Sequence, residues 1–144
     1  MTKKLLLAIC LLISGLTYAQ DLLVSEVPPT VLNSFNKSFP KATRVEWERK
    51  GDLYNVEFDV ARRDNEVWLN DKGAIVKHKK ELRSSELPAA VFNTLKQSYK
   101  GFRIDDVDRY EEAKKFYYKV ELKKLLEERK VVLDQSGKVI NKVY

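Results

Sequence analysis

The chain has 144 residues, with 27 lysines and arginines against 21 aspartates and glutamates, which gives a net charge of +6. Basic and acidic residues are interspersed, a pattern that does not indicate a nucleic-acid-binding surface, so no nucleic-acid partner is expected. The single cysteine excludes an internal disulfide. The length fits one ordinary domain, or two very small ones that stabilise each other.

The N-terminal segment, residues 1–19, has the composition of a cleavable signal peptide. Lys3 and Lys4 precede an apolar run at residues 5–16, and small residues follow that suit cleavage after Ala19. The run is too short for a membrane-spanning helix, which needs about 20 apolar residues. Cleavage removes two basic residues and no acidic one, so we predict a periplasmic or secreted protein of net charge +4 without a stable membrane anchor.

The first element of the mature chain is a helix that begins at Pro28. Proline suits the first turn of a helix, where its missing N–H has no partner to lose. Val31, Phe35 and Phe39 recur every four residues and form one apolar stripe, which predicts a helix with one buried side. Pro40 is predicted to end this helix.

Strand patterns follow the helix. Trp47 is predicted to be a core residue under the helix, and residues 53–60 alternate apolar and polar side chains, as in a sheet with one covered face. Asn70–Gly73 has the Asx-first, Gly-last composition of a tight turn before a strand that starts at Ile75. The charged segment His78–Glu86 is predicted to be an exposed connector.

The same order of patterns recurs after Pro88. Residues 87–95 match residues 27–35 at a spacing of 60 residues, and residues 118–122 match residues 54–58 at a spacing of 64 residues. Such self-similarity is the sequence signature of a repeated structural unit.

The repetition leads to a predicted architecture. The second copy has four additional residues, which we place in a longer first hairpin at Tyr110–Lys115. The predicted fold class is α+β, with two tandem α-β-β-β-β repeats at residues 20–82 and 83–144, and with the helices packed on one face of antiparallel sheets. Whether the repeats share one continuous sheet is left open at this point.

This combination of patterns resembles a known family. An apolar-Pro helix start, a Tyr-x-Val-Glu-apolar strand and an Asx-x-x-Gly turn each occur twice, within Val27–Lys77 and Leu87–Val143. The chain is similar to the PepSY-like, beta-lactamase-inhibitor-like domains of exported bacterial proteins. The resemblance implies tandem helix-plus-sheet units outside the cytoplasm. It also implies a fold like that of proteins that bind and block hydrolases, but no inhibitory residue transfers to this sequence.

The sequence predicts no catalytic residue, cofactor or metal site. His78, the only histidine, lies among lysines that repel a metal ion, and no nucleophile pairs with it. The carboxylates Glu46 and Glu48 share a strand face beside arginines, which indicates solvated ion pairs rather than an acid–base pair. The lysine pairs at residues 114–115 and 123–124 are interpreted as solvated hairpin ends. We therefore predict that the protein is not an enzyme.

The candidate site is a face of the sheet that binds a partner. Trp68 lies between Val67 and Leu69, so it points away from the helix if these two neighbours face the helix. Strand parity assigns four residues to this face: Trp68, Tyr117, Leu53 and Val132. Aromatic anchors on a partly apolar face are typical of protein-binding surfaces. Burial between the two copies and homo-oligomer formation are the alternatives.

The predicted function is an exported, non-catalytic protein-binding module that modulates or inhibits an enzyme in the periplasm. The sequence does not identify the target. The alternatives are a self-associating structural envelope protein and a small-ligand carrier with a cavity between helix and sheet.

Overall fold

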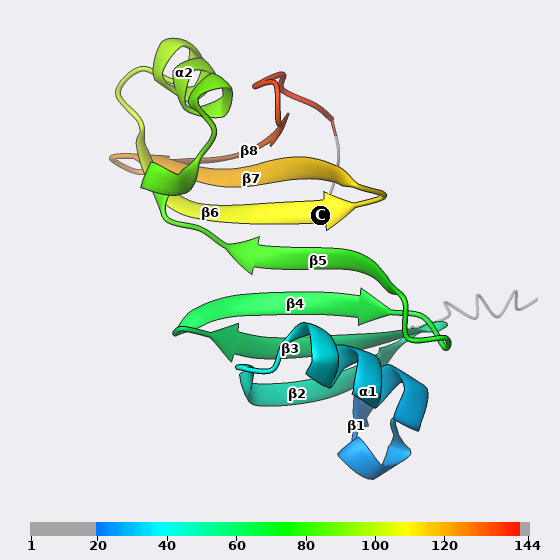
Figure 1. Ribbon diagram of the computed structural model, residues 1–144. Helices are drawn as coiled ribbons and strands as arrows, with labels where there is room; N and C mark the ends of the chain where they lie inside the picture. Colours follow the sequence, from blue (N-terminus) through cyan, green and yellow to red (C-terminus); the bar gives the residue numbers. More distant parts are fainter. Residues whose placement is uncertain (1–19, 142–144) are drawn as a thin grey trace, which may run out of the picture.

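The computed structural model describes residues 20–141, so the predicted signal peptide lies outside the described residues. The chain forms one eight-stranded antiparallel sheet in which every strand pairs with its neighbours in chain order (Figure 1). The strands are β1 Gln20–Leu22, β2 Thr43–Lys50, β3 Leu53–Val60, β4 Arg63–Leu69, β5 Ile75–Glu81, β6 Arg103–Glu112, β7 Lys115–Lys124 and β8 Glu127–Asp134. The helices are α1 Pro29–Ser38 and α2 Ala89–Ser98, each preceded by a 3-10 turn, at Val24–Glu26 and Ser84–Glu86. The predicted α+β class is confirmed.

The first core cluster is rich in aromatic side chains. Its buried members are Val27, Val31, Phe35, Trp47, Val56, Phe58, Val67 and Leu69. The ring of Phe35 makes edge-to-face contacts with Trp47 at 5.2 Å and with Phe58 at 5.0 Å between centroids. This geometry is favourable because the positive edge of one ring meets the negative face of another. Trp47 is buried, which confirms its predicted place in the core.

The second core cluster is mainly aliphatic. Its buried members are Leu87, Val91, Leu95, Val107, Tyr118, Val120, Leu122, Val131 and Leu133. One row of cross-strand partners runs through Phe58, Asn65, Lys80, Arg109, Tyr118 and Leu133. Partners that face each other across a ladder point to the same side of the sheet. The row therefore places both clusters on one side, with α1 and α2 at opposite ends of the sheet (Figure 1).

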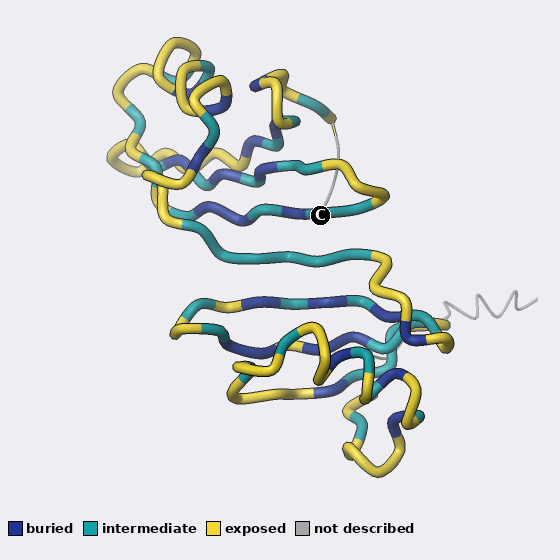
Figure 2. Tube along the Cα trace, viewed as in Figure 1, coloured by how far each residue is buried: buried dark blue, intermediate teal, exposed yellow. Residues whose placement is uncertain are grey.

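The strand β5 joins the two halves into one continuous sheet. It pairs with β4 on one side and with β6 on the other, and residues 77–81 are half-buried (Figure 2). The prediction of an exposed connector at His78–Glu86 is therefore wrong for residues 78–81. This strand lies between the two cores and contributes no residue to either of them, and its residues 77–81 are all charged or histidine, so its sequence lacks the usual alternation.

The first hairpin of the second half is longer than that of the first half. The strands β6 and β7 have ten residues each, whereas β2 and β3 have eight residues each. The longer hairpin closes at the pair Glu112–Lys115. The predicted placement of the additional residues at Tyr110–Lys115 is confirmed.

Both Asx-x-x-Gly turns pack against a helix. Gly73 has a φ of +77° and Gly137 a φ of +83°, the left-handed conformation that glycine adopts without strain. A Cβ atom at Gly73 would lie 2.9 Å from the carbonyl oxygen of Thr30 in α1, and one at Gly137 would lie 2.5 Å from that of Ala90 in α2. The absence of a side chain therefore lets each turn approach the helix backbone.

The ends of the sheet differ from the prediction of four strands in each copy. After Gly137 the described residues form only an isolated bridge between Leu133 and Val139, not a strand. This segment has a sheet neighbour on one side only, whereas β5, its counterpart, pairs on both sides. At the other end, β1 adds an edge strand beside β2, in which Asp21 pairs with Glu48.

Candidate functional site

The side of the sheet opposite the two core clusters carries the predicted partner-binding residues, and we call it the open face. Val67 and Leu69 are buried in the first core, so Trp68 between them points to the open face. All four predicted residues lie there on separate strands and are half-buried: Trp68 on β4, Tyr117 on β7, Leu53 on β3 and Val132 on β8. Trp68 and Tyr117 flank the central strands, whereas Leu53 and Val132 lie farther out.

A row of aromatic and basic side chains occupies the centre of the open face. The Nζ atom of Lys77 lies 4.5 Å from the ring centroid of Trp68 and 5.2 Å from that of Tyr110. Tyr110 is the cross-strand partner of Tyr117. We call these four residues the aromatic row. Contacts between a cation and an aromatic face are attractive, so Lys77 links the aromatic residues of the two halves.

Sequence reasoning missed two members of the aromatic row. Lys77 belongs to the strand that was predicted only to start at Ile75, and Tyr110 lies at the start of the segment in which the additional residues of the second copy were placed. Tyr110 stands between charged residues, and its immediate neighbours do not indicate which side of the sheet it faces. Only the pairing of β5 with β6 brings these side chains together.

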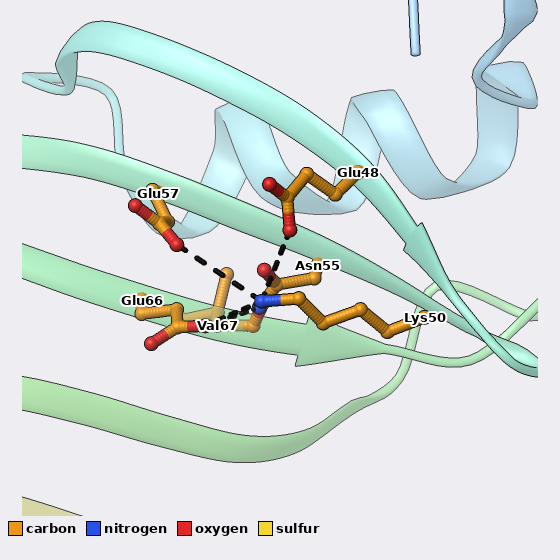
Figure 3. A network of polar contacts seen from close by, with 6 residues as sticks. All are labelled: Glu48, Lys50, Asn55, Glu57, Glu66 and Val67. Carbon is orange, nitrogen blue, oxygen red and sulfur yellow. Dashed lines mark hydrogen bonds and ion pairs between the residues drawn. The ribbon is translucent and has the colours of Figure 1, made fainter. Parts of the chain in front are cut away.

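An acidic network lies on the open face of the first half (Figure 3). The Nζ atom of Lys50 is 3.0 Å from a carboxylate oxygen of Glu48 and 3.2 Å from one of Glu66, and a third carboxylate, that of Glu57, is 4.0 Å away. Burial acts to lower the pKa of Lys50, but hydrogen bonds and attraction from Glu48 and Glu66 leave this pKa raised. Burial, together with repulsion from Glu66, raises the pKa of the Glu57 carboxyl.

Asn55 lies under this network and is fully buried. Its side-chain amide donates to Glu66 at 2.9 Å and to the carbonyl oxygen of Val67 at 3.4 Å. Its Oδ1 atom has no hydrogen-bond partner. The amide orients the Glu66 carboxylate toward Lys50, so this part of the open face is a preorganised acidic surface.

The open face of the second half carries a different charge arrangement. Asp108 is buried and faces Lys79 at 3.5 Å and Lys119 at 4.0 Å. Burial raises the pKa of Asp108, although the two lysines act to lower it. One buried carboxylate therefore lies between two cations, where the first half has three carboxylates around one cation.

His78 lies on the side of the sheet that carries the core clusters, and its predicted full exposure is wrong. Its Nε2 atom is 3.1 Å from Oδ1 of Asn65, and its ring contacts Phe39. Burial, with repulsion from Arg109 and Lys80, lowers the pKa of His78 to about 4. The ring is therefore neutral at pH 7 and donates a structural hydrogen bond to Asn65.

The remaining candidate chemistry consists of ion pairs. Asp105 accepts from Lys123 and Arg103 at 2.5 and 2.6 Å, and Arg44 pairs with Asp59. Within residues 20–141, no group of three or more histidine, cysteine or acidic side chains has the arrangement of a metal site. In that same part of the chain, no helix is both long and apolar enough to cross a membrane.

Comparison with known sequences gives a match to one family. The sequence pattern of a family described as beta-lactamase-inhibitor-like and PepSY-like matches residues 17–77 and residues 52–141, two overlapping regions that together span most of the chain. No curated protein matches this sequence.

Comparison with solved structures gives several chains of similar fold. A BLIP-like protein from Bacteroides fragilis is 24% identical with a TM-score of 0.66, and the match covers 79% of this chain and 83% of that one. A DUF2874 family protein from Bacteroides uniformis is 22% identical with a TM-score of 0.69, covering 79% and 86%. A protein named as a candidate periplasmic protein from Bacteroides eggerthii is 19% identical with a TM-score of 0.70, covering 80% and 86%. These similarities establish the fold.

Proposed function

This chain belongs to the beta-lactamase-inhibitor-like, PepSY-like family, and on this premise we propose that it is an exported, non-catalytic module that binds a protein partner with its open face. The observation that carries the proposal is the aromatic row. Trp68 and Tyr117 are half-buried on an antiparallel sheet face that none of the helices within residues 20–141 covers, and Lys77 lies over the Trp68 ring. Aromatic side chains of low mobility are the usual anchors of protein interfaces.

The acidic network adds specificity to this surface. Three carboxylates gathered around Lys50 favour a partner with a basic patch opposite the first half. Charge complementarity of this kind raises association rates and rejects partners of the wrong charge. We propose that the partner is an enzyme of the periplasm that is modulated or inhibited, in keeping with the family description and with the BLIP-like protein of similar fold.

The architecture and location are part of the same proposal. Residues 20–82 and 83–144 are two tandem copies of one unit, an assignment supported by the two overlapping family matches and by the same order of 3-10 turn, helix and strands in each half. Export through cleavage after Ala19 is supported by the composition of residues 1–19 and by the candidate periplasmic protein of similar fold.

The test is capture of a partner by variants of the mature chain. Trp68→Ala together with Tyr117→Ala should reduce capture of an enzyme from the periplasmic fraction at least tenfold, because central interface aromatics contribute most of the binding free energy, about 2 kcal/mol or more each. The captured enzyme is then purified, and its affinity for each variant is measured by calorimetry. Phe92→Ala is the matched control, since Phe92 is an exposed aromatic residue on α2.

Two outcomes would contradict the proposal. Equal affinity of the double variant and the parent would exclude the aromatic row as the contact surface. If the parent forms a dimer that the same double substitution dissociates, the open face is a self-association surface, as in the structural alternative. Light scattering over a range of concentrations measures the oligomeric state.

The small-ligand carrier is tested by native mass spectrometry, which would detect a small molecule bound to the purified protein.

A further inference from the structure

The turn between β7 and β8 presents two leucines to solvent. The exposed fraction is 98% for Leu125 and 105% for Leu126, as high as for side chains in an extended chain. They form the whole two-residue turn, which β7 leaves at Lys124 and β8 enters at Glu127 (Figure 1). We call Leu125 and Leu126 the leucine tip. Two adjacent apolar side chains without a packing partner among the described residues indicate a contact with something outside the fold.

The backbone does not favour leucine at this turn. Leu125 has a φ of +52°, a left-handed conformation that glycine, asparagine or aspartate adopts at lower cost. The other two-residue hairpin turns of the described chain are formed by small or polar residues, at Gly51–Asp52, Ala61–Arg62 and Ala113–Lys114. The leucine tip therefore serves neither the turn nor the core.

Cations surround the base of the leucine tip. The ring of Phe102 lies below Lys124, with Nζ at 5.7 Å from the centroid, and below the Arg129 guanidinium at 5.3 Å. Lys124 also passes 3.4 Å from the position of a Cβ atom on Gly101, which brings the loop with Lys100 next to the tip. Two acids also lie at the base of the tip. Glu127 is opposite Lys124 in the ladder but is paired with Arg129 at 2.6 Å, and Glu128 lies 3.8 Å from Lys130, so Arg129 and Lys130 offset these acids and the charges of Lys100 and Lys124 remain.

The positive net charge of the mature chain is located entirely in the second half, which carries the leucine tip. Residues 20–82 contain 11 basic and 11 acidic residues, a net charge of zero, whereas residues 83–144 contain 14 basic and 10 acidic residues, a net charge of +4. An anionic surface therefore attracts the second half and orients the molecule with the leucine tip toward it.

We propose that the leucine tip inserts into an anionic lipid surface, with the two leucines at the boundary of the acyl chains and Lys100 and Lys124 at the phosphate groups. A convex tip of two residues buries little area in a rigid protein surface, whereas a bilayer closes around any apolar protrusion. Apolar insertion combined with attraction of lysines to anionic headgroups is a general basis of peripheral membrane binding. The open face remains available to a partner.

Sedimentation with lipid vesicles tests the proposal on the mature chain, residues 20–144. Binding is expected to vesicles of phosphatidylglycerol mixed with phosphatidylcholine, and at least about tenfold weaker binding to phosphatidylcholine alone. Leu125→Gly combined with Leu126→Ser should weaken binding to the anionic vesicles at least about tenfold, because it removes both apolar side chains. Glycine adopts the positive φ at position 125 without strain, so this variant should remain folded, and circular dichroism verifies the fold.

A fluorescence experiment locates the contact on the molecule. The mature chain has no cysteine, so Leu126→Cys can carry a single environment-sensitive dye, and Ala113→Cys carries the same dye on a hairpin at the opposite end of β7. Anionic vesicles should shift the emission of the first dye to the blue and leave the second unchanged.

Vesicle binding that is equal in the parent and the leucine variant, or absent from the parent, would overturn the proposal. A shift of both dyes would overturn it as well, since it would indicate adsorption without orientation. The open-face variant Trp68→Ala with Tyr117→Ala should bind vesicles like the parent, which distinguishes this proposal from the proposed function.

Discussion

The two halves of the sheet have the same order of elements but differ in the side chains that fill and surround them. The first half has an aromatic core, an acidic network on its open face and a net charge of zero. The second half has an aliphatic core, the leucine tip and a net charge of +4. The halves share the apolar stripe of the helix and the glycine turn, and both of these features stabilise the fold. The residues that give each half its own surface properties are therefore those at which the halves differ.

The largest expected effect comes from truncating the central helix residue of each core. Phe35→Ala should lower the free energy of unfolding by about 4 kcal/mol, and Leu95→Ala by about 3 kcal/mol, because Phe35 loses two edge-to-face contacts in addition to buried area. Urea unfolding followed by circular dichroism measures both losses. A larger loss for Leu95→Ala would show that the aromatic contacts do not make the first core more sensitive to truncation.

The glycine turns provide the next comparison. Gly137→Ala should cost about 3 kcal/mol and Gly73→Ala about 2 kcal/mol, because the added Cβ would approach a helix carbonyl oxygen to 2.5 Å in the second half and 2.9 Å in the first. Gly51→Ala is the control, since Gly51 also has a positive φ but nothing lies within 4 Å of its added Cβ, so only about 1 kcal/mol is expected. Equal losses at all three positions in thermal unfolding would exclude the close approach to the helices as the cause.

The strip between the halves should give a pH-dependent stability. Because the pKa of His78 is about 4 in the folded protein and 6.5 in a model peptide, the unfolded chain binds more protons between these values. The contribution of neutral His78 is therefore present at pH 7 and is lost as the pH falls from 6.5 toward 4, by about 2 kcal/mol after allowance for its partial exposure. The free energy of unfolding of the parent minus that of His78→Gln should decrease over this range, and a pH-independent difference would contradict the assignment.

The smallest expected effect concerns the acidic network of the first half. Lys50→Met leaves Glu48, Glu57 and Glu66 without their shared cation and should lower stability by about 1 kcal/mol at low salt, less at high salt. Urea unfolding at two ionic strengths measures this. A loss that does not depend on salt would mean that the Lys50 methylene groups, rather than its charge, stabilise the strands.

Periodicity predicted the parts of the fold in which one side of an element is apolar. The stripe of Val31 and Phe35, the place of Trp47 in the core and the orientation of Trp68 follow from such patterns. The longer first hairpin of the second half follows instead from the change in repeat spacing from 60 to 64 residues. The central strand β5 gave no pattern, because residues 77–81 are all charged or histidine and so show no alternation of apolar and polar side chains. Without that strand, the meeting of Lys77 with Tyr110 was not predictable.

Single positions that break a local rule also escaped the sequence analysis. Asn55 is polar in an alternating strand and reads as exposed, yet side chains of the network cover it completely. The lysine pair at residues 123–124 was interpreted as a hairpin end, and β7 does end at Lys124, but no sequence pattern indicated that Leu125 and Leu126 form the exposed turn itself. The burial of such residues depends on which strands pair in the folded chain, and the residues next to them in the sequence do not indicate that pairing.

The strand β5 has a mechanical consequence for the whole molecule. Within residues 20–141, neither core cluster contains a residue of β5, so the junction is held by ladder hydrogen bonds, by side-chain contacts of Lys77 and Lys79, and by the ion pair of Arg63 with Glu86. Because no core packing crosses β5, we expect any bending of the sheet to be concentrated along this strand. Bending there would change the curvature of the surface that bears Trp68 and Tyr117 while both cores remain intact.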